Sequence, residues 1–353
     1  MPDLKRNSIL ESLPVVEHID ITKFDVTGLV DAMGKTAFQA RNLARAGAIY
    51  DAMLRDPGCA VIFTLAGSLV SAGQRRVIVD LMKSRMIDAI VATGANIVDQ
   101  DFLEALGFKH YQGDIRADDA WLREHRVDRI YDTYVSEDEL GVSDNTVAEI
   151  AAALEPRPYS SREFLRETGA WLVANGLGKD SIIRVAYELG VPIFVPAFSD
   201  CSAGLGLLKH QWEHPDAHVT IDSARDFREL FMCKRLVADT GLIMLGGGVP
   251  KNFAQDITVA GEVIGEEYPM HKYAVQITVA DERDGALSGS TLREARSWGK
   301  VDLEMEQMVY GEATILFPLL AGYAYHQQGW TAREFFRFND RLDEVAVEEP
   351  VSA

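Results

Sequence analysis

Short apolar segments alternate with amphipathic helical segments along most of the chain. The pattern predicts buried strands at 59–67, 87–96, 191–200, 217–222, 241–248 and 273–281. It predicts helices between them, at 28–54, 74–85, 204–212 and 224–238. Apolar strands separated by helices are typical of a parallel sheet that is covered on both faces. The sequence therefore predicts an α/β fold built on one mostly parallel sheet.

The remaining segments divide the chain into three parts. Residues 1–27 lack a regular pattern and are expected to form an N-terminal extension that packs on another protein surface, which the sequence does not identify. Residues 28–330 are expected to form a single domain, in which the charged segment 115–180 is a mostly helical insertion packed on the sheet. Residues 331–353 are expected to form a C-terminal helix or tail.

Polar and glycine-rich loops follow five of the predicted strands. Because the ligand of such a sheet lies beyond the carboxyl ends of its strands, these loops are expected to gather around one site. Asp200 and Asp284 lie in two of them, where a carboxylate could bind a ribose hydroxyl pair or an amine nitrogen. The alternative is that each carboxylate caps the helix that follows. The five loops are 67–73, 93–96, 198–204, 246–252 and 280–285.

Standard nucleotide-binding motifs are missing. The tripeptide GKT at 34–36 is not a phosphate loop, because Leu29 stands where that motif needs glycine, and GxGxxG does not occur. The segment GGGVPKN (246–252) follows a strand and precedes a helix, so it could hold a phosphate or simply form a tight turn. Histidine and cysteine spacings indicate neither a metal site nor a disulfide framework.

The charge and hydropathy of the chain limit its partners and location. A formal net charge of -19 argues against nucleic acid as a partner, since binding phosphates needs a basic surface. The acidic field either concentrates cationic ligands or only keeps the protein in solution. The N-terminal sequence has no apolar run suited to a signal peptide, and no stretch approaches the length of a membrane span. We therefore expect a cytoplasmic protein without a membrane partner.

The heptapeptide ARSWGKV (295–301) sets Lys300 close behind Trp298. One interpretation is that Lys300 caps a helix. The other is that Trp298 helps to desolvate the amine and keeps it neutral and nucleophilic.

Three segments carry a resemblance to a known family. GLIMLGGGVPKN (241–252), YAVQITVADERDGALSGSTLREARSWGKV (273–301) and ATILFPLL (313–320) strongly resemble the deoxyhypusine synthase family, and the likeness extends from about residue 30 to 325. The resemblance implies a doubly wound, Rossmann-like domain of the deoxyhypusine synthase type that binds NAD. It also implies a homotetramer whose active sites are shared between subunits, and it assigns the catalytic lysine to Lys300.

The resemblance places the cofactor contacts residue by residue. Most fall in the strand-end loops, and Glu312 stands where the family often has aspartate. The implied NAD-binding residues are Gly67, Ser68, Ser71, Thr93, Gly94, Ala95, Asp99, Asp200, Gly247, Val279, Ala280, Asp284, Glu312 and Ala313.

The substrate half of the site departs from the family pattern. Glu294 and Trp298 are retained as donor contacts, and Gly285 is assigned beside them. Leu205 and Leu287, however, replace aspartates of the family, and Asn252 replaces a histidine. Because leucine cannot compensate a buried ammonium, a spermidine donor held in the usual way is not expected.

With the residues that remain, the resemblance implies an NAD-dependent aminoalkyl transferase. In the family mechanism NAD takes a hydride from the carbon beside a donor amine, and Lys300 attacks the resulting imine to form a Schiff base. An acceptor amine then displaces the lysine and the stored hydride reduces the product. We expect small di- or polyamine substrates, as in homospermidine-type synthesis. Two alternatives are an authentic deoxyhypusine synthase that modifies a lysine of a translation initiation factor, and a non-catalytic module that binds NAD or another ligand.

Overall fold

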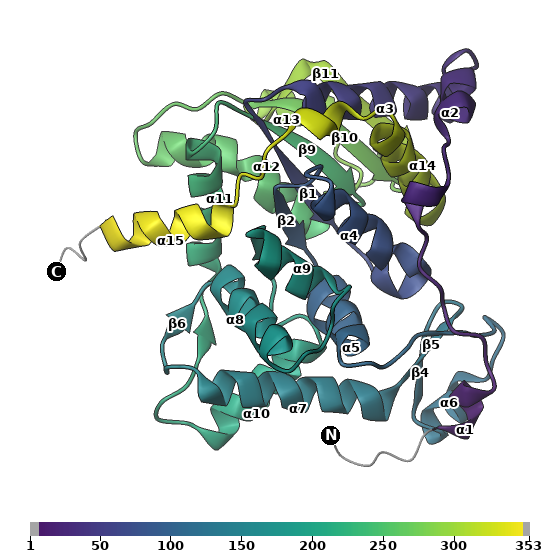
Figure 1. Cartoon of the computed structure of the whole chain (residues 1–353), viewed down its shortest axis with the longest axis vertical. Coiled ribbons are helices and arrows are strands. Elements are labelled where there is room, and N and C mark those ends of the chain that lie inside the picture. Colours follow the sequence, from purple (N-terminus) through teal and green to yellow (C-terminus); the bar gives the residue numbers. More distant parts are fainter. Residues whose placement is uncertain (1–6, 349–353) are drawn as a thin grey trace.

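Six strands form one parallel sheet in the computed structural model, which describes residues 7–348 (Figure 1). Their order across the sheet is β11-β10-β9-β1-β2-β7, and every neighbouring pair is parallel. The predicted α/β class with a mostly parallel sheet is thereby confirmed. The strands are β1 (Cys59–Leu65), β2 (Ala89–Ala92), β7 (Ile193–Phe194), β9 (Asp239–Leu245), β10 (His271–Thr278) and β11 (Val301–Tyr310).

Helices cover both faces of this sheet, and β1 shows how. Val61, Phe63 and Leu65 belong to one buried cluster, whereas Ala60 and Ile62 point to the other. The first cluster is completed by α3 (Phe38–Arg55), α4 (Arg75–Lys83), α9 (Ile182–Leu189) and α14 (Ala313–His326). The second is completed by α11 (Ser223–Arg235), α12 (Gly248–Val263), α13 (Leu292–Ser297) and α15 (Phe338–Glu348). Burial on both sides explains why these strands are apolar throughout.

The chain reverses direction across the sheet between β1 and β9. It runs outward from β1 to β2 and β7, and then returns to β9 on the other side of β1. Such a switch point leaves a crevice beyond the carboxyl ends of the two strands, because their connections leave on opposite faces. The topology is the doubly wound one, and the loops after β1 and β9 flank the crevice.

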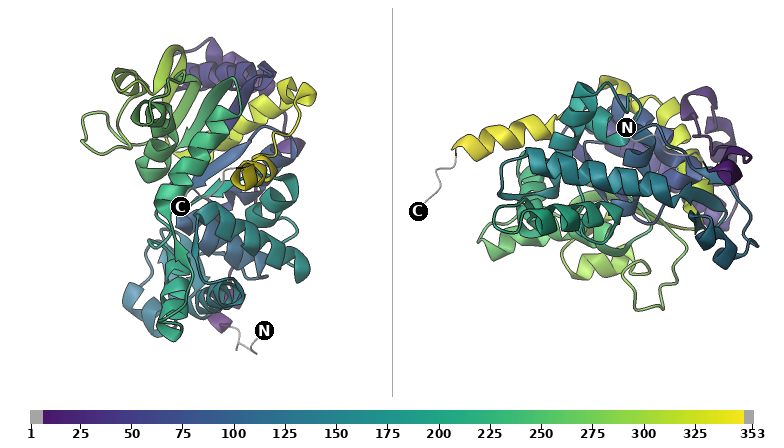
Figure 2. Two further views of the ribbon diagram at one scale, coloured as in Figure 1. Left: turned by 90° about the vertical axis from the view of Figure 1, so that its left-hand side faces the viewer. Right: turned by 90° about the horizontal axis from the view of Figure 1, so that it is seen from below.

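A second layer of structure lies beyond the β7 end of the sheet. It contains α5 (Phe102–Ala105), α6 (Asp119–Glu124), α7 (Glu137–Ala153), α8 (Ser161–Ala174) and α10 (Ser202–Glu213), and α7 packs along α10 (Figures 1 and 2). It also contains an antiparallel sheet of β3 (Tyr111–Gln112), β5 (Thr133–Ser136) and β4 (Val127–Ile130). The prediction of a mostly helical insertion missed β4 and β5, which join through a tight turn at Tyr131.

Two further sequence predictions need correction. The strand expected at 217–222 is reduced to β8 (Thr220–Ile221), which pairs with β6 (Pro158–Tyr159) outside the main sheet. The single helix expected at 28–54 is two helices, α2 (Thr27–Gly34) and α3, because Ala37 is extended and the Thr36 hydroxyl bonds back to the carbonyl of Met33. Strand β11 was not predicted at all.

The N-terminal extension docks on its own chain. It forms α1 (Ser8–Glu11) and a 3-10 turn, η1 (Ile21–Lys23), and Val15 bridges Tyr111. The Ile19 amide donates to the Gly73 carbonyl at 3.0 Å, and the His18 ring lies 2.7 Å from Glu104. Residues 1–6 of the predicted extension lie outside the described residues.

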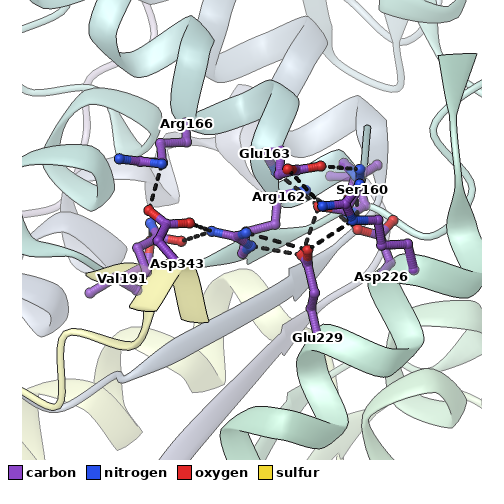
Figure 3. A network of polar contacts seen from close by, with 12 residues as sticks. Ser160, Arg162, Glu163, Arg166, Val191, Asp226, Glu229 and Asp343 are labelled. Atoms are coloured by element: carbon purple, nitrogen blue, oxygen red, sulfur yellow. Dashed lines mark hydrogen bonds and ion pairs between the residues drawn. The ribbon is translucent and has the colours of Figure 1, made fainter. Parts of the chain in front are cut away.

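The C-terminal segment forms a 3-10 turn, η4 (Gly329–Ala332), and then α15, which projects from the body (Figure 2). Arg162 of α8 anchors its first turns by bonding to both Asn339 and Asp343, and to Glu229 on α11 (Figure 3). Residues 349–353 lie outside the described residues. Across residues 7–348, no helix is both long enough and apolar enough to cross a bilayer.

Candidate functional site

Glycine backbone lines the crevice at the switch point. Gly67 follows β1 and Gly248 opens α12, and both have positive φ, of 71° and 61°. A β-carbon at either residue would meet nothing within 4 Å, so this backbone faces open space. Gly247, the residue before α12, provides no side-chain cap. The first amides of α12 are therefore available to an anionic ligand at the crevice.

The loop after β1 is held in place by a neighbouring segment, η3 (Ala95–Asp101). Asn96 accepts a hydrogen bond from the Leu69 amide at 2.8 Å and donates to the Gly67 carbonyl at 2.7 Å. Gln100 accepts from the Ser71 amide at 2.9 Å. Neither Asn96 nor Gln100 was predicted as a site residue. Their only sequence signal was their position in the loop after β2, beside the predicted Thr93.

Several of the predicted cofactor residues make contacts within the chain that hold the loops in place. The Thr93 hydroxyl donates to the Gly67 carbonyl at 3.0 Å, and the buried Ser71 hydroxyl donates to the Ser68 carbonyl at 2.9 Å. Asp99 accepts from the Ala203 amide at the start of α10, and burial raises the pKa of this carboxyl to about 6. Gly94 packs against Cys201, where a β-carbon would lie 2.4 Å from Sγ. These residues shape the loops around the crevice.

Three predicted carboxylates remain exposed at the edge of the sheet. Asp200 follows β7, Asp284 follows β10 and Glu312 follows β11. Four strand spacings separate β7 from β10, which is roughly 19 Å. Asp200 and Asp284 therefore lie in loops that start on opposite sides of the switch point. The other predicted residues on this side, Val279, Ala280 and Ala313, lie next to β10 and β11.

The crevice fits a dinucleotide. Open glycine backbone and an uncapped helix start suit a pyrophosphate, and exposed carboxylates at strand ends suit ribose hydroxyls. Gly67, Ser68, Gly248 and Asp284 are the residues best placed to hold it. The predicted Gly247 packs against Ser288, where a β-carbon would lie 2.4 Å from Cα.

A second hollow, of about 950 Å³, lies between α12, α13 and the loop after β10. It brings together Lys300 and five of the six residues expected to contact substrate, and does not include Leu205. That residue lies on α10 and is exposed. The residues of this hollow used below are Asn252, Asp256, Gly285, Leu287, Glu294, Trp298 and Lys300.

Lys300 is fixed in the hollow through both its backbone and its amine. Its amide donates to the Ala295 carbonyl at 3.1 Å and its carbonyl accepts from the His271 amide at 2.9 Å. The Nζ atom lies 2.5 Å from Asp256 Oδ1 and 3.1 Å from Asn252 Oδ1. Asn252 Nδ2 in turn donates to Asp256 Oδ2 at 2.8 Å. The three side chains form a closed set of contacts.

The expected role of Trp298 is not what the structure shows. Its side chain is 64% exposed, and Lys300 Nζ lies 5.4 Å from the ring centroid. A ring that is mostly exposed does not enclose the amine, so the expected desolvation of Lys300 by Trp298 is not seen in this arrangement. Asp256 is the partner that sequence reasoning missed. The sequence signal for Asp256 was its position four residues after Asn252 at the start of a predicted helix, a spacing that places the two side chains next to each other.

A second lysine, Lys251, is buried behind the hollow. Lys251 is fully buried, and its amine donates to the carbonyls of Leu287 and Ser290. Burial lowers the pKa of Lys251 to about 8. This lysine ties α12 to the loop that carries Leu287, and so determines where that side chain lies.

Residues 28–324 match the family model described as DS, deoxyhypusine synthase. The chain belongs to the deoxyhypusine synthase family. A deoxyhypusine synthase-like protein of Chlorobaculum parvum is 62% identical over 333 residues, which cover 94% of this chain and 95% of the relative. One from Elusimicrobium minutum is 58% identical, with 94% and 89% covered.

A solved structure shows the same fold. A protein of Entamoeba histolytica, provisionally named a deoxyhypusine synthase, superposes with a TM-score of 0.60 at 18% identity, covering 92% of this chain and 99% of the other. The deoxyhypusine synthase family is a family of transferases that depend in general on NAD.

Proposed function

We propose that this protein is an NAD-dependent aminoalkyl transferase that carries the transferred group on Lys300 and acts on small di- or polyamines. The observation that carries the proposal is the Lys300 amine, held 2.5 Å from Asp256 in a hollow that also contains Glu294. A lysine can form a Schiff base with a carbonyl or imine carbon, and carboxylates can hold the ammonium groups of an amine substrate.

The cofactor would lie in the crevice beyond β1 and β9, held by the residues named above. The chemistry that NAD supplies when bound is reversible hydride acceptance at a carbon next to an amine. The chain itself would orient the donor amine against Glu294 and Asp256, and would present Lys300 Nζ to the reacting carbon.

The lining of the hollow supports a small amine over spermidine in the family's usual pose. Leu287 faces the hollow without a charge, and Asn252 is already bonded to Asp256 and Lys300. Asp256 contacts the amine and Glu294 lines the same hollow, so a short diamine could pair each of its ends with a carboxylate. Homospermidine-type synthesis from such diamines is the reaction we propose.

Borohydride trapping tests the proposal directly. The protein is incubated with NAD and putrescine, agmatine, spermidine or diaminopropane, reduced, digested and mapped by mass spectrometry. We expect an aminoalkyl adduct on Lys300, and none in Lys300→Arg, because arginine stays protonated and cannot attack. Lys251→Met is the matched control, since it removes the other lysine near the hollow, and its Lys300 should still be labelled.

Two outcomes would contradict the proposal. An absence of adducts with every amine would favour a non-catalytic binding module. Efficient transfer to the lysine of a translation initiation factor, with no free polyamine product, would identify an authentic deoxyhypusine synthase instead.

A further inference from the structure

The Lys300 amine has one anionic partner in contact with it, and that partner is Asp256. Glu262 and Glu294 also line the hollow, and Lys251 lies behind it. Of these titratable groups in the described chain, only Asp256 is in direct contact with Lys300 Nζ. Asn252 touches the amine as well, but an amide cannot take up a proton at neutral pH.

Asp256 is also held in a fixed orientation. Its Oδ2 accepts the Asn252 amide at 2.8 Å, which leaves Oδ1 directed at Lys300. Residues 252 and 256 are one helical turn apart on α12, so the carboxylate sits on a rigid element and not on a loop. A carboxylate placed in this way can receive a proton from the amine without rearrangement.

We propose that Asp256 is the proton acceptor that frees the Lys300 amine, and the donor that returns the proton to the departing amine. The inference rests on the proposed aminoalkyl transfer for its chemical step. A proton moves from Lys300 Nζ to Asp256 Oδ1, and the freed lone pair bonds to the imine carbon of the substrate. The bond from that carbon to the original amine breaks, and this amine takes the proton from Asp256. The step consumes no net proton and involves no oxidation.

This arrangement also indicates the substrate class. While Lys300 is charged it neutralises Asp256, but once the lysine is covalently bound the carboxylate loses that partner. An incoming primary amine in its ammonium form would replace the lost charge and lie next to the bound carbon. The site therefore suits a primary alkylammonium acceptor whose proton Asp256 can remove before it attacks.

The first test needs neither NAD nor substrate. Acetic anhydride labelling at pH 8, followed by peptide mapping, measures the reactivity of Lys300 in the folded protein. Asp256→Asn keeps the shape of the side chain and removes its charge, so labelling of Lys300 should become roughly tenfold faster. Glu262→Gln, which removes a carboxylate of the same hollow that does not contact Lys300, should leave labelling unchanged. Equal labelling in wild type and Asp256→Asn would overturn the inference.

The second test follows the rate at which borohydride traps the Lys300 adduct. Asp256→Asn should trap roughly a hundredfold more slowly at pH 7, because the departing amine then lacks its proton donor, whereas Asp256→Glu should restore part of the rate. Trapping by Asp256→Asn at the wild-type rate would overturn the inference. Labelling that responds to Asp256→Asn, in a protein that traps no amine, would remove the proposed function and leave the proton exchange between Asp256 and Lys300 in place.

Discussion

The buried amine of Lys251 donates a hydrogen bond to the backbone carbonyl of Ser290 at 2.5 Å. A second bond, to the Leu287 carbonyl at 3.2 Å, makes this lysine the link between α12 and the loop after β10. Neutral carbonyls accept the bonds but do not cancel the charge, so the burial of Lys251 costs more when the amine is protonated.

This cost predicts a pH dependence of stability. The pKa of Lys251 is about 8 in the folded protein and 10.5 in the unfolded chain. Between these values the unfolded chain binds more protons, so the free energy of unfolding rises with pH. From pH 7.5 to 9.5 Lys251 should add about 1–2 kcal/mol.

Urea unfolding at the two pH values measures this contribution. Lys251→Met should lose the gain, and the surface variant Lys83→Met, which breaks only an exposed pair with Asp180, should keep it. An equal gain in Lys251→Met would assign the pH dependence to other groups.

A second prediction concerns the attachment of α15. Arg162 is buried and binds Glu229 at 2.7 Å and Asp343 at 3.2 Å (Figure 3). Arg162→Met should lower the free energy of unfolding by about 3 kcal/mol, because it leaves the largely buried Glu229 with only the more exposed Arg225, at 3.3 Å, as a cationic partner. Hydrogen exchange should also accelerate at residues 338–344.

Arg166→Met is the matched control for Arg162. It removes a more exposed contact to the same Asp343, so it should cost less than about 1 kcal/mol. Similar losses in both variants would mean that burial of Arg162 is not what anchors the helix.

The sequence predicted the parts of the fold that depend on local pattern. Strands β1, β9 and β10 are buried on both faces, so they appear as continuous apolar runs between helices. Strand β11 was missed because Asp302, Glu304 and Glu306 interrupt its apolar residues at the edge of the sheet. The pairing of β8 with β6 depends on a contact between distant segments, which local pattern does not reveal.

The candidate site divides in the same way. Lys300, Glu294 and Trp298 lie in one motif, and the structure places all three in one hollow with Asn252 and Leu287. Asp256 was not predicted, because its contact with Lys300 exists only once the fold packs α12 against the segment that follows α13. The separation of Asp200 from Asp284 likewise follows from strand order, which the sequence does not state.

That separation gives a third prediction. We expect NAD to bind, and calorimetry to show weaker binding for both Asp200→Ala and Asp284→Ala. Since the two carboxylates follow strands that stand four places apart in the sheet, their effects on the binding free energy should add if both contact the cofactor. Glu334→Ala, on the far segment after η4, is the control and should bind as the wild type does. Unchanged affinity in both aspartate variants would remove these residues from the cofactor site.

The last prediction concerns α10, where the predicted substrate residue Leu205 lies away from the hollow. Leu205, Leu208 and Trp212 are 58%, 60% and 85% exposed, and their spacing places them on one face of the helix. The opposite face packs tightly, since a β-carbon on Gly206 would lie 2.5 Å from the Asp144 carbonyl of α7. An exposed apolar face of this kind is typical of an interface between chains.

We expect a second copy of the chain to cover this face, in a homotetramer or at least a dimer, so that Leu205 reaches a site shared between subunits. Light scattering at micromolar concentration should show the oligomer for the wild type and a smaller species for Leu208→Glu combined with Trp212→Glu, because two buried charges would oppose association. Val173→Glu, at an exposed apolar residue on α8, should leave the mass unchanged. A monomeric wild type would exclude both the assembly and a shared site. An oligomer that survives the double substitution would place the interface on another face of the molecule.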